Sequence, residues 1–166
     1  GAFGPFSEQF FVGDQMNGSV MRVDLEQVEG HYQGACFPFV EGLDSGVNRL
    51  AFAPDGSLFV GQTDRGWGSL GERSYGLQRI AWNGTVPFEI LHMNARPDGF
   101  DLEFTEDLDP ETAGDPGSYR FWSFTYAYHR DYGALETEGA DLEVLEARVL
   151  GPRRVRLTLS GTREGF

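Results

Sequence analysis

The sequence contains no lysine, and it has little positive charge of any kind. All 13 basic residues are arginine, and against 26 acidic residues they leave a formal net charge of −13. Nucleic-acid phosphates and anionic membranes both select basic surfaces, so this balance argues against either as a partner. No segment reaches the roughly 20 apolar residues that a membrane-spanning helix needs, and neither an initiator methionine nor a signal peptide is present.

Cysteine is nearly absent as well. The single Cys36 cannot form an internal disulfide, and it lies between the apolar residues Ala35 and Phe37. This setting predicts a buried, inert thiol rather than a nucleophile. The Cys-x-x-Cys-His motif that attaches haem covalently is missing from the sequence.

Glycine and aromatic residues, by contrast, are abundant. The chain has 23 glycines, 14% aromatic residues and 40% hydrophobic residues in 166 positions. Long runs of strong helix formers are scarce. This composition favours an all-β protein with enough apolar material for a core.

An internal repeat runs through the first half of the chain. The segment Phe10–Asp14 resembles Leu58–Gln62, 48 residues later, and the segment around Arg22 resembles the segment around Arg79. A repeat of about 40–50 residues with four short strands is typical of a β-propeller blade. The recurrence of the two arginines at one repeat position indicates an architectural role.

The second repeat should be a whole blade. We expect its strands at residues 49–53, 57–62, 76–82 and 87–91, with turns at Pro54-Asp55-Gly56 and Asn83-Gly84. The first repeat lacks an opening strand. The sequence therefore predicts that residues 1–93 form about two blades of four-stranded antiparallel sheet. Since two blades cannot close a ring, we expect the remaining propeller blades to be supplied by a longer parent chain.

The pattern changes after about residue 93. Residues 100–104 alternate apolar and acidic side chains, residues 119–128 form an aromatic strand, and residues 140–150 and 155–159 alternate again. The stretch from 106 to 117 is rich in turn residues, with room for one helical turn. These short strands predict an immunoglobulin-like β-sandwich over residues 94–166, truncated at its last strand.

Two stretches together resemble a known family. The segments "RLAFAPDGSLFVG", "LFVGQTDRGWG" and "LQRIAWNGTVPFEI" resemble the terminal propeller blades of large secreted bacterial proteins related to quinone-dependent glucose/sorbosone dehydrogenases. The following "MNARPDGFDLEFTEDLDPETAGDPGSY" resembles the small immunoglobulin-like domain that follows such propellers. The resemblance covers about residues 4–93 for the blades and most of the remainder for the sandwich.

The resemblance implies an extracytoplasmic protein, periplasmic or secreted, connected with the oxidation of sugars or alcohols. It also implies a quinone of the PQQ type or a haem in the parent protein, with no cofactor held by this chain. In the soluble quinone dehydrogenases the catalytic base and most cofactor contacts come from other blades, and His31 lies only in a hairpin. No catalytic residue is therefore carried over, and whether the parent is an enzyme stays open.

The loop from Thr63 to Tyr75 is the first candidate site. Asp64, Arg65 and Trp67 combine two opposite charges with a flat ring, a set that would suit a sugar, a quinone or a carboxylate. A structural alternative is that Asp64 and Arg65 pair with each other or with neighbours, while Trp67 packs between blades. Both interpretations remain open from the sequence.

Four further features have structural alternatives. His129, within a polar and aromatic stretch, is a candidate ligand or general base, although no nucleophile or second carboxylate accompanies it. Asp14 and Gln62 occupy equivalent strand ends, where such residues usually fix loops through backbone amides. The acidic residues between 107 and 115 lack calcium-loop spacing, and Asp-Pro pairs favour a solvated turn.

Two functions of different classes follow. The first is a structural C-terminal fragment of a secreted dehydrogenase-like propeller protein, whose main catalytic groups lie outside this chain. The alternative is a non-catalytic module that binds carbohydrate or protein through its aromatic β surface.

Overall fold

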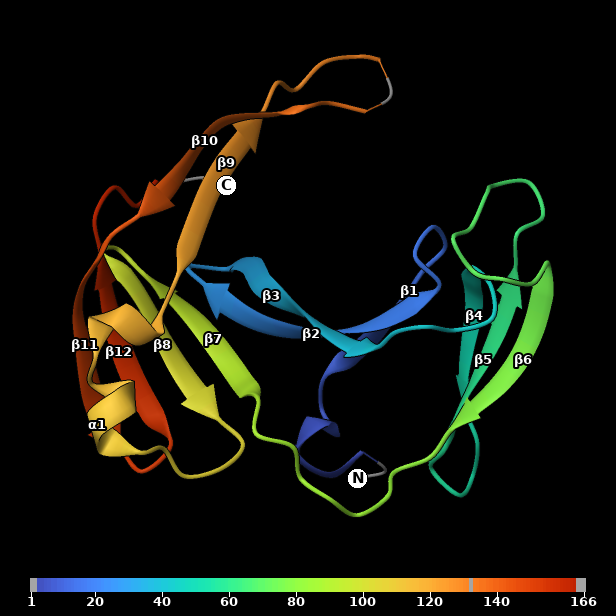
Figure 1. The fold of residues 1–166 in the computed structure, drawn as a ribbon, viewed down its shortest axis with the longest axis horizontal. Helices are drawn as coiled ribbons and strands as arrows, with labels where there is room; N and C mark the ends of the chain where they lie inside the picture. The colour runs from blue at the N-terminus through green and yellow to red at the C-terminus, as the bar shows by residue number, and fades with distance from the viewer. Residues whose placement is uncertain (1–2, 132, 164–166) are drawn as a thin grey trace. The chain divides into compact units, whose positions relative to one another are not determined.

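The computed structural model describes residues 3–131 and 133–163. Strands account for 52% of the chain and helices for 6%, which confirms the predicted all-β class. The strands form four antiparallel sheets, and within the described residues none of them closes on itself (Figure 1). The chain divides into two compact units, Gly1–Pro87 and Phe88–Phe166. No helix in the described ranges is long and apolar enough to cross a membrane.

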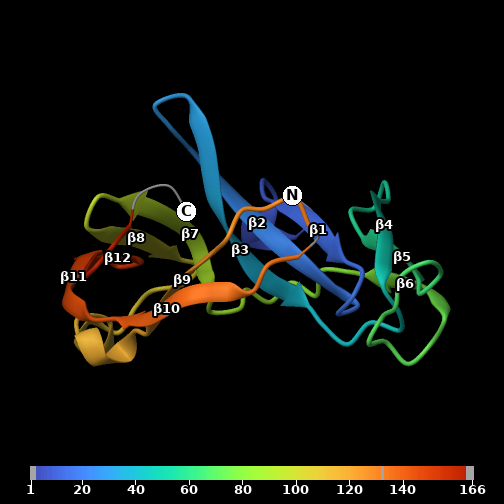
Figure 2. The same ribbon diagram turned by 90° about the horizontal axis from the view of Figure 1, so that it is seen from above.

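The first unit contains a short 3₁₀ helix and two three-stranded sheets. In the first sheet β2 and β3 form a long twisted hairpin, which is seen well in Figure 2, and β1 lies at the edge. The second sheet has β5 in its centre. The elements are η1 (Gly4–Phe6), β1 (Phe10–Asp14), β2 (Ser19–Val28), β3 (His31–Val40), β4 (Val47–Phe52), β5 (Leu58–Thr63) and β6 (Tyr75–Ile80).

The sequence repeat corresponds to a repeat in strand pairing. In the first sheet Phe11 on β1 lies opposite Arg22 on β2. In the second sheet Phe59 on β5 lies opposite Arg79 on β6, so the echoing residues have the same register. The two similar segments therefore fold into equivalent antiparallel pairs.

The fourth strand predicted for the second repeat, residues 87–91, is wrong. β6 has no partner on its outer side in the described residues, and the chain from 81 to 89 is irregular. The next strand, β7 (Ile90–Arg96), pairs with β8 (Gly99–Phe104) in the second unit. The second sheet thus has three strands instead of the four predicted, while the first has three, as expected for a repeat without its opening strand. The apolar residues after Pro87 identify a strand correctly, but the tight turn at Pro97-Asp98 gives that strand a nearer partner.

Aromatic rings fill the space between the two sheets of the first unit. Phe3 lies 5.4 Å from both Phe11 and Phe39, measured between ring centroids, and Phe11 lies 5.8 Å from Phe52 on β4. Successive side chains on a strand point to opposite faces of the sheet, so only every second residue of each strand can contribute a ring to this space. On β1 the two neighbours of Phe11, Phe10 and Val12, therefore face outward and are 62% and 43% exposed.

Cys36 is exposed, so the prediction of a buried thiol is wrong. On β3 the side chains of Ala35, Phe37 and Phe39 are partly buried, while Cys36 and Pro38 between them are exposed. The apolar neighbours of Cys36 are buried because they lie on the other face of the strand. Local composition indicated a core, whereas strand alternation decides which residues enter it.

The second unit consists of a four-stranded sheet and a separate two-stranded hairpin. The larger sheet has the order β11-β12-β8-β7, and β9 pairs with β10. A short helix and a 3₁₀ turn connect β8 to β9. The remaining elements are α1 (Pro110–Ala113), η2 (Pro116–Ser118), β9 (Phe121–Tyr126), β10 (Glu136–Leu142), β11 (Val144–Gly151) and β12 (Arg154–Leu159).

The core of this unit lies on one face of the larger sheet. Leu102 and Phe104 of β8 and Val155 and Leu157 of β12 are buried there, 0–8% exposed. The predicted alternation of residues 100–104 and 155–159 is confirmed, because the intervening residues face the other side. Tyr119 covers this core and donates a 2.8 Å hydrogen bond to the carbonyl of Ala113.

The acidic connection between β8 and β9 is organised as turns, as predicted. Asp109 caps α1 by accepting hydrogen bonds from the amides of Glu111 and Thr112. Asp115 accepts a 2.9 Å hydrogen bond from the amide of Gly117. These carboxylates therefore stabilise local backbone turns.

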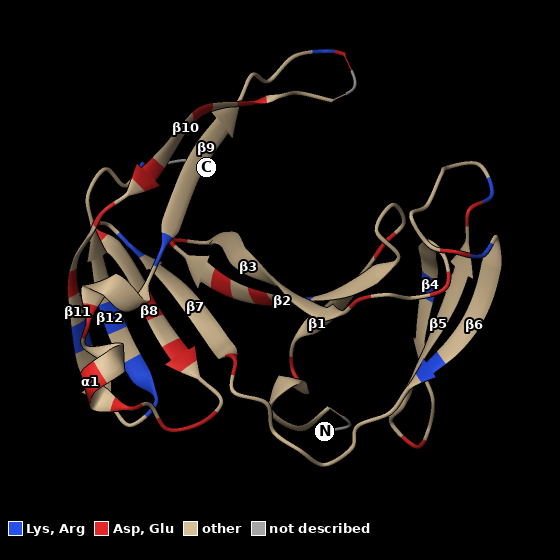
Figure 3. Cartoon of the chain, viewed as in Figure 1, with Lys and Arg blue, Asp and Glu red and all other residues tan. Residues whose placement is uncertain are grey.

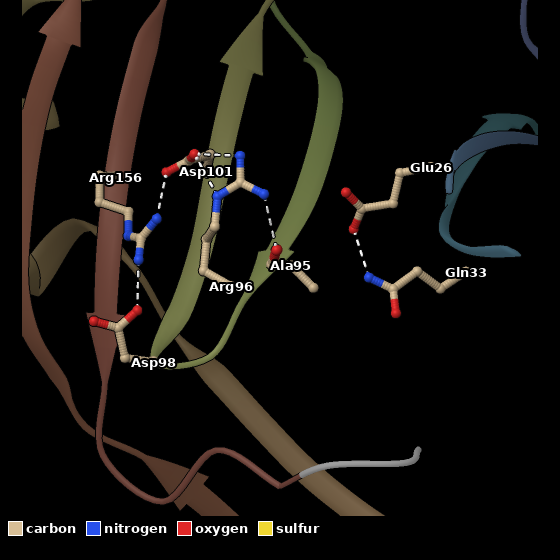
Figure 4. A network of polar contacts seen from close by, with 7 residues as sticks. All are labelled: Glu26, Gln33, Ala95, Arg96, Asp98, Asp101 and Arg156. Atoms are coloured by element: carbon tan, nitrogen blue, oxygen red, sulfur yellow. Dashed lines mark hydrogen bonds and ion pairs between the residues drawn. The ribbon is translucent and has the colours of Figure 1, made fainter. Parts of the chain in front are cut away.

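The opposite face of the larger sheet carries an ion-pair network (Figure 4). Asp101 on β8 receives a 2.8 Å hydrogen bond from Arg96 and a 3.1 Å hydrogen bond from Arg156. Arg156 also pairs with Asp98 at the β7–β8 turn. Burial alone would raise the pKa of Asp101, but the hydrogen bonds and positive charges of the two arginines outweigh it and lower the pKa.

Candidate functional site

The loop that joins β5 to β6 keeps both of its ends tied by backbone hydrogen bonds. The amide of Asp64 donates to the carbonyl of Ser74 at 3.0 Å, and the amide of Arg65 donates to the hydroxyl of Thr63 at 3.0 Å. Gly66 then turns the chain with a φ of 90°, a value that favours glycine. The start of the loop thus has a defined direction.

The middle of the loop is fixed to two neighbouring loops of the same unit. The amide of Leu70 donates to the carbonyl of Met16 at 2.8 Å, and the amide of Arg73 donates to the carbonyl of Asp44 at 2.9 Å. The guanidinium of Arg73 also lies 3.5 Å from the Asp44 carboxylate. At Gly71 a Cβ atom would lie 2.4 Å from the Asp44 carbonyl oxygen, so only glycine allows this approach.

A pair of glutamines, one buried and one partly buried, supports that anchor. Gln62, 6% exposed, accepts a 2.8 Å hydrogen bond from the amide of Ser45 and donates a 2.7 Å hydrogen bond to Gln78. Gln78 in turn accepts a 3.0 Å hydrogen bond from the amide of Asp44. The prediction that Gln62 fixes a loop through a backbone amide is confirmed.

Asp14, at the equivalent strand end, also acts on backbone amides as predicted. Its Oδ1 atom accepts hydrogen bonds from the amides of Met16 and Asn17 at 2.8 and 3.0 Å. Hydrogen bonds from Asn17, first from its amide and then from its side chain, are the main reason that the pKa of Asp14 is lowered. The carboxylate is therefore committed to its turn.

The two repeated arginines both make architectural contacts. The guanidinium of Arg22 lies between two aromatic rings, 4.5 Å from the centroid of Phe6 and 4.2 Å from that of Phe37. Arg79 is half exposed and pairs with Asp55 in the β4–β5 turn at 2.7 Å. Equivalent residues thus stabilise equivalent hairpins by different means.

The loop between β5 and β6 contains both basic and acidic positions (Figure 3). The side chains of Arg65 and Trp67 in this loop are exposed to solvent. Arg65 is exposed, and in the described part of the chain no carboxylate pairs with its guanidinium. Trp67 is 69% exposed, so it is not packed away between sheets. The alternative in which Asp64 and Arg65 pair with each other is wrong, since neither side chain has an ion pair among the described residues. An exposed aromatic ring and an exposed guanidinium are groups that can contact a planar or an anionic ligand.

His129 lies in the other unit, in the loop between β9 and β10. It lines an open pocket of about 410 Å³ together with aromatic and acidic residues. The structure thus brings Asp64, Arg65 and Trp67 onto one loop and assigns His129 to a different one. Within residues 3–131 and 133–163, no group of three or more His, Cys, Asp or Glu residues could hold a metal ion.

Two residues of the anchoring network were missed in the sequence. Gln78 lies two residues before the partly buried Ile80 on β6, so the strand period could have placed both on the inner face of the sheet. Asp44 precedes Ser45-Gly46, a combination that signals a tight turn. Neither pattern specifies which loop the residue would contact.

Comparison with known proteins identifies no relative, because no family model, no curated protein and no solved structure matches the chain.

Proposed function

We propose that the chain is a structural part of a larger propeller-type assembly, in a secreted protein related to sugar- or alcohol-oxidising dehydrogenases. Residues 1–87 would contribute two neighbouring sheets, and residues 88–166 an immunoglobulin-like accessory domain. The main catalytic groups and a quinone or haem would belong to the rest of the parent protein. The proposal for fold rests on geometry, and the connection with dehydrogenases rests on the sequence resemblance.

One observation carries the structural part of this proposal, namely that both sheets of the first unit leave an apolar face open. On the first sheet Phe10 and Leu25 are 62% and 46% exposed. On the second sheet Tyr75 and Leu77 of β6 are 78% and 72% exposed. Exposed apolar faces of this kind mark surfaces that bind another element. Stacked propeller sheets would cover both faces with further sheets of the same kind.

A matched pair of variants tests whether a further sheet packs on the exposed face of β6. Leu77 lies on the open sheet face, while Leu70, similarly exposed at 75%, lies on the anchored loop. In the protein encoded by the complete reading frame, Leu77→Glu should lower the melting temperature strongly, because it would place a charge in a sheet–sheet interface. Leu70→Glu should leave it within about a degree, as surface changes usually do. An unchanged melting temperature for Leu77→Glu would contradict the structural proposal.

The dehydrogenase part has its own test. The isolated chain should show no turnover of sugars or alcohols with added PQQ and a dye acceptor, since we assign the reacting groups to other parts of the protein. Turnover by the isolated chain would refute that assignment.

A second function, carbohydrate binding, is favoured by the exposed ring of Trp67 beside an unpaired guanidinium on an anchored loop. Titration calorimetry against a panel of sugars should then give saturable heats that Trp67→Ala abolishes and Leu70→Ala preserves. The absence of heat for every sugar would count against this function.

A further inference from the structure

The hairpin of β9 and β10 carries a pocket that the proposed function does not use. The pocket has a volume of about 410 Å³, which falls in the range of small-molecule sites. Its walls include the side chains of Phe124, Tyr126 and Tyr128, together with Asp131 and Glu136. Aromatic rings and carboxylates therefore share one small volume.

The aromatic residues are held on one face of the hairpin by strand phase. Phe124 and Tyr126 alternate with the partly buried Ser123 and Thr125 along β9. Phe124 is 43% exposed, Tyr126 54% and, farther along the chain, Tyr128 97%. Burying large rings is a main source of folding free energy, so a cluster left this open is available to a ligand.

The two acidic residues that line the pocket, Asp131 and Glu136, are accompanied there by His129, while Arg130 lies between His129 and Asp131 in the sequence and does not line the pocket. β9 has no charged residue, whereas β10 carries acidic residues, as Figure 3 shows. Glu136 lies directly opposite Tyr126 in the hairpin register. Among the described residues Glu136 and Asp131 have no hydrogen-bond or ion-pair partner, whereas Glu138 is paired with Arg163 at 2.7 Å. The pocket thus holds two unneutralised carboxylates.

We propose that this pocket binds an alkylated ammonium group, such as the trimethylammonium of choline or of a methylated lysine. The faces of aromatic rings attract cations, and they also favour the apolar methyl groups around a quaternary nitrogen. The carboxylates of Asp131 and Glu136 supply the countercharge. An anionic ligand would meet repulsion from the same groups, and a neutral sugar would gain no attraction from their charge.

Calorimetric titration of the whole chain with choline tests this proposal, and 3,3-dimethylbutanol, which has the same shape without the charge, is the matched ligand. We expect saturable millimolar binding of choline and at least severalfold weaker binding of the neutral compound. A trimethyllysine peptide and phosphatidylcholine vesicles, titrated in parallel, distinguish a protein source of the cation from a lipid source. Equal affinity for the neutral compound, or no binding of any ammonium ligand, would overturn the proposal.

Variants connect binding to the pocket. Tyr126→Leu should weaken choline binding about two- to fivefold through loss of one ring, and Glu136→Gln should weaken it by a similar factor that shrinks as salt is added. Tyr32→Leu removes a tyrosine that is 74% exposed on β3 in the first unit and should leave binding unchanged. Circular dichroism checks that each variant is folded. If Glu136→Gln, a conservative exposed change, binds choline as tightly as the unmodified chain, the assigned role of the carboxylate is wrong.

Discussion

Replacement of Arg22 by lysine should destabilise the first unit far more than the same replacement at Arg79. The two arginines occupy one repeat position and the same register, opposite Phe11 and Phe59. Their surroundings differ, since Arg22 is 1% exposed while the Arg79 side chain is 51% exposed. The pair therefore separates the effect of position from the effect of environment.

The magnitude follows from the contacts of the Arg22 guanidinium. Its planar group stacks between the rings of Phe6 and Phe37 and donates a 3.1 Å hydrogen bond to Gln9. A lysine ammonium keeps the charge, but it is more strongly hydrated and cannot lie flat against two rings. A loss of about 1 kcal/mol for each ring and about 1 kcal/mol for the hydrogen bond gives a destabilisation of about 3 kcal/mol. For Arg79→Lys the loss should be smaller, because the contacts of this half-exposed guanidinium, an ion pair with Asp55 and a 2.9 Å hydrogen bond to the Ser57 hydroxyl, lie near solvent.

Urea unfolding followed by tryptophan fluorescence measures both values. The Trp122→Phe background removes the tryptophan of the second unit, so that Trp67 and Trp82 report on residues 1–87 alone. The unfolding free energies of Arg22→Lys and Arg79→Lys in this background are then compared with that of the background itself, provided that the dependence of the free energy on urea concentration is the same for all three proteins. A difference below about 1 kcal/mol between the two variants would refute the account of a stacked, buried guanidinium.

Two further predictions concern other parts of the molecule. Asp101→Asn should destabilise the second unit by about 2 kcal/mol at neutral pH, because Asp101 is 12% exposed between Arg96 and Arg156. The pKa of Asp101 is lowered in the folded protein. The difference in unfolding free energy between Asp101→Asn and the unmodified chain should therefore be complete above about pH 4 and should vanish as the pH falls through the lowered pKa. A difference in urea unfolding that does not change with pH would contradict this prediction. The exposed thiol of Cys36 should react with a disulfide reagent in the native protein as fast as in the unfolded chain, and protection in the native state would contradict its assigned face.

The sequence was sufficient to predict most strands, because the alternation of apolar and polar residues within a strand shows which of its side chains face the core. Alternation places Leu102 inward and Asp101 outward on β8, and the two Asp-Pro pairs mark the starts of α1 and η2. The sequence repeat was also visible, and the structure shows that its equivalent residues have one pairing register, with Phe11 opposite Arg22 and Phe59 opposite Arg79. These features depend on neighbours within a few residues or on one hairpin.

What could not be predicted depends on partners distant in the sequence. The apolar run after Pro87 has the same local pattern whether it completes the β4–β6 sheet or begins a new one. Cys36 shows the same limit on a smaller scale, since its neighbours indicate a core but only the contact of Phe39 with Phe3 fixes which face is buried. In the candidate loop, Arg65 and Trp67 were identified by residue type, whereas their exposure follows from anchors on other loops.

The anchoring of that loop has a consequence for any binding function. Hydrogen bonds to the carbonyl groups of Met16 and Asp44 fix the backbone of the loop. At Gly71 the loop lies so close to Asp44 that any side chain larger than hydrogen would clash with it. The conformational entropy of this loop is therefore already lost on folding, so a ligand that contacts Trp67 does not have to order the loop when it binds. The hydrogen bonds that anchor the loop thus hold the exposed ring of Trp67 and the cation of Arg65 in place before any ligand binds.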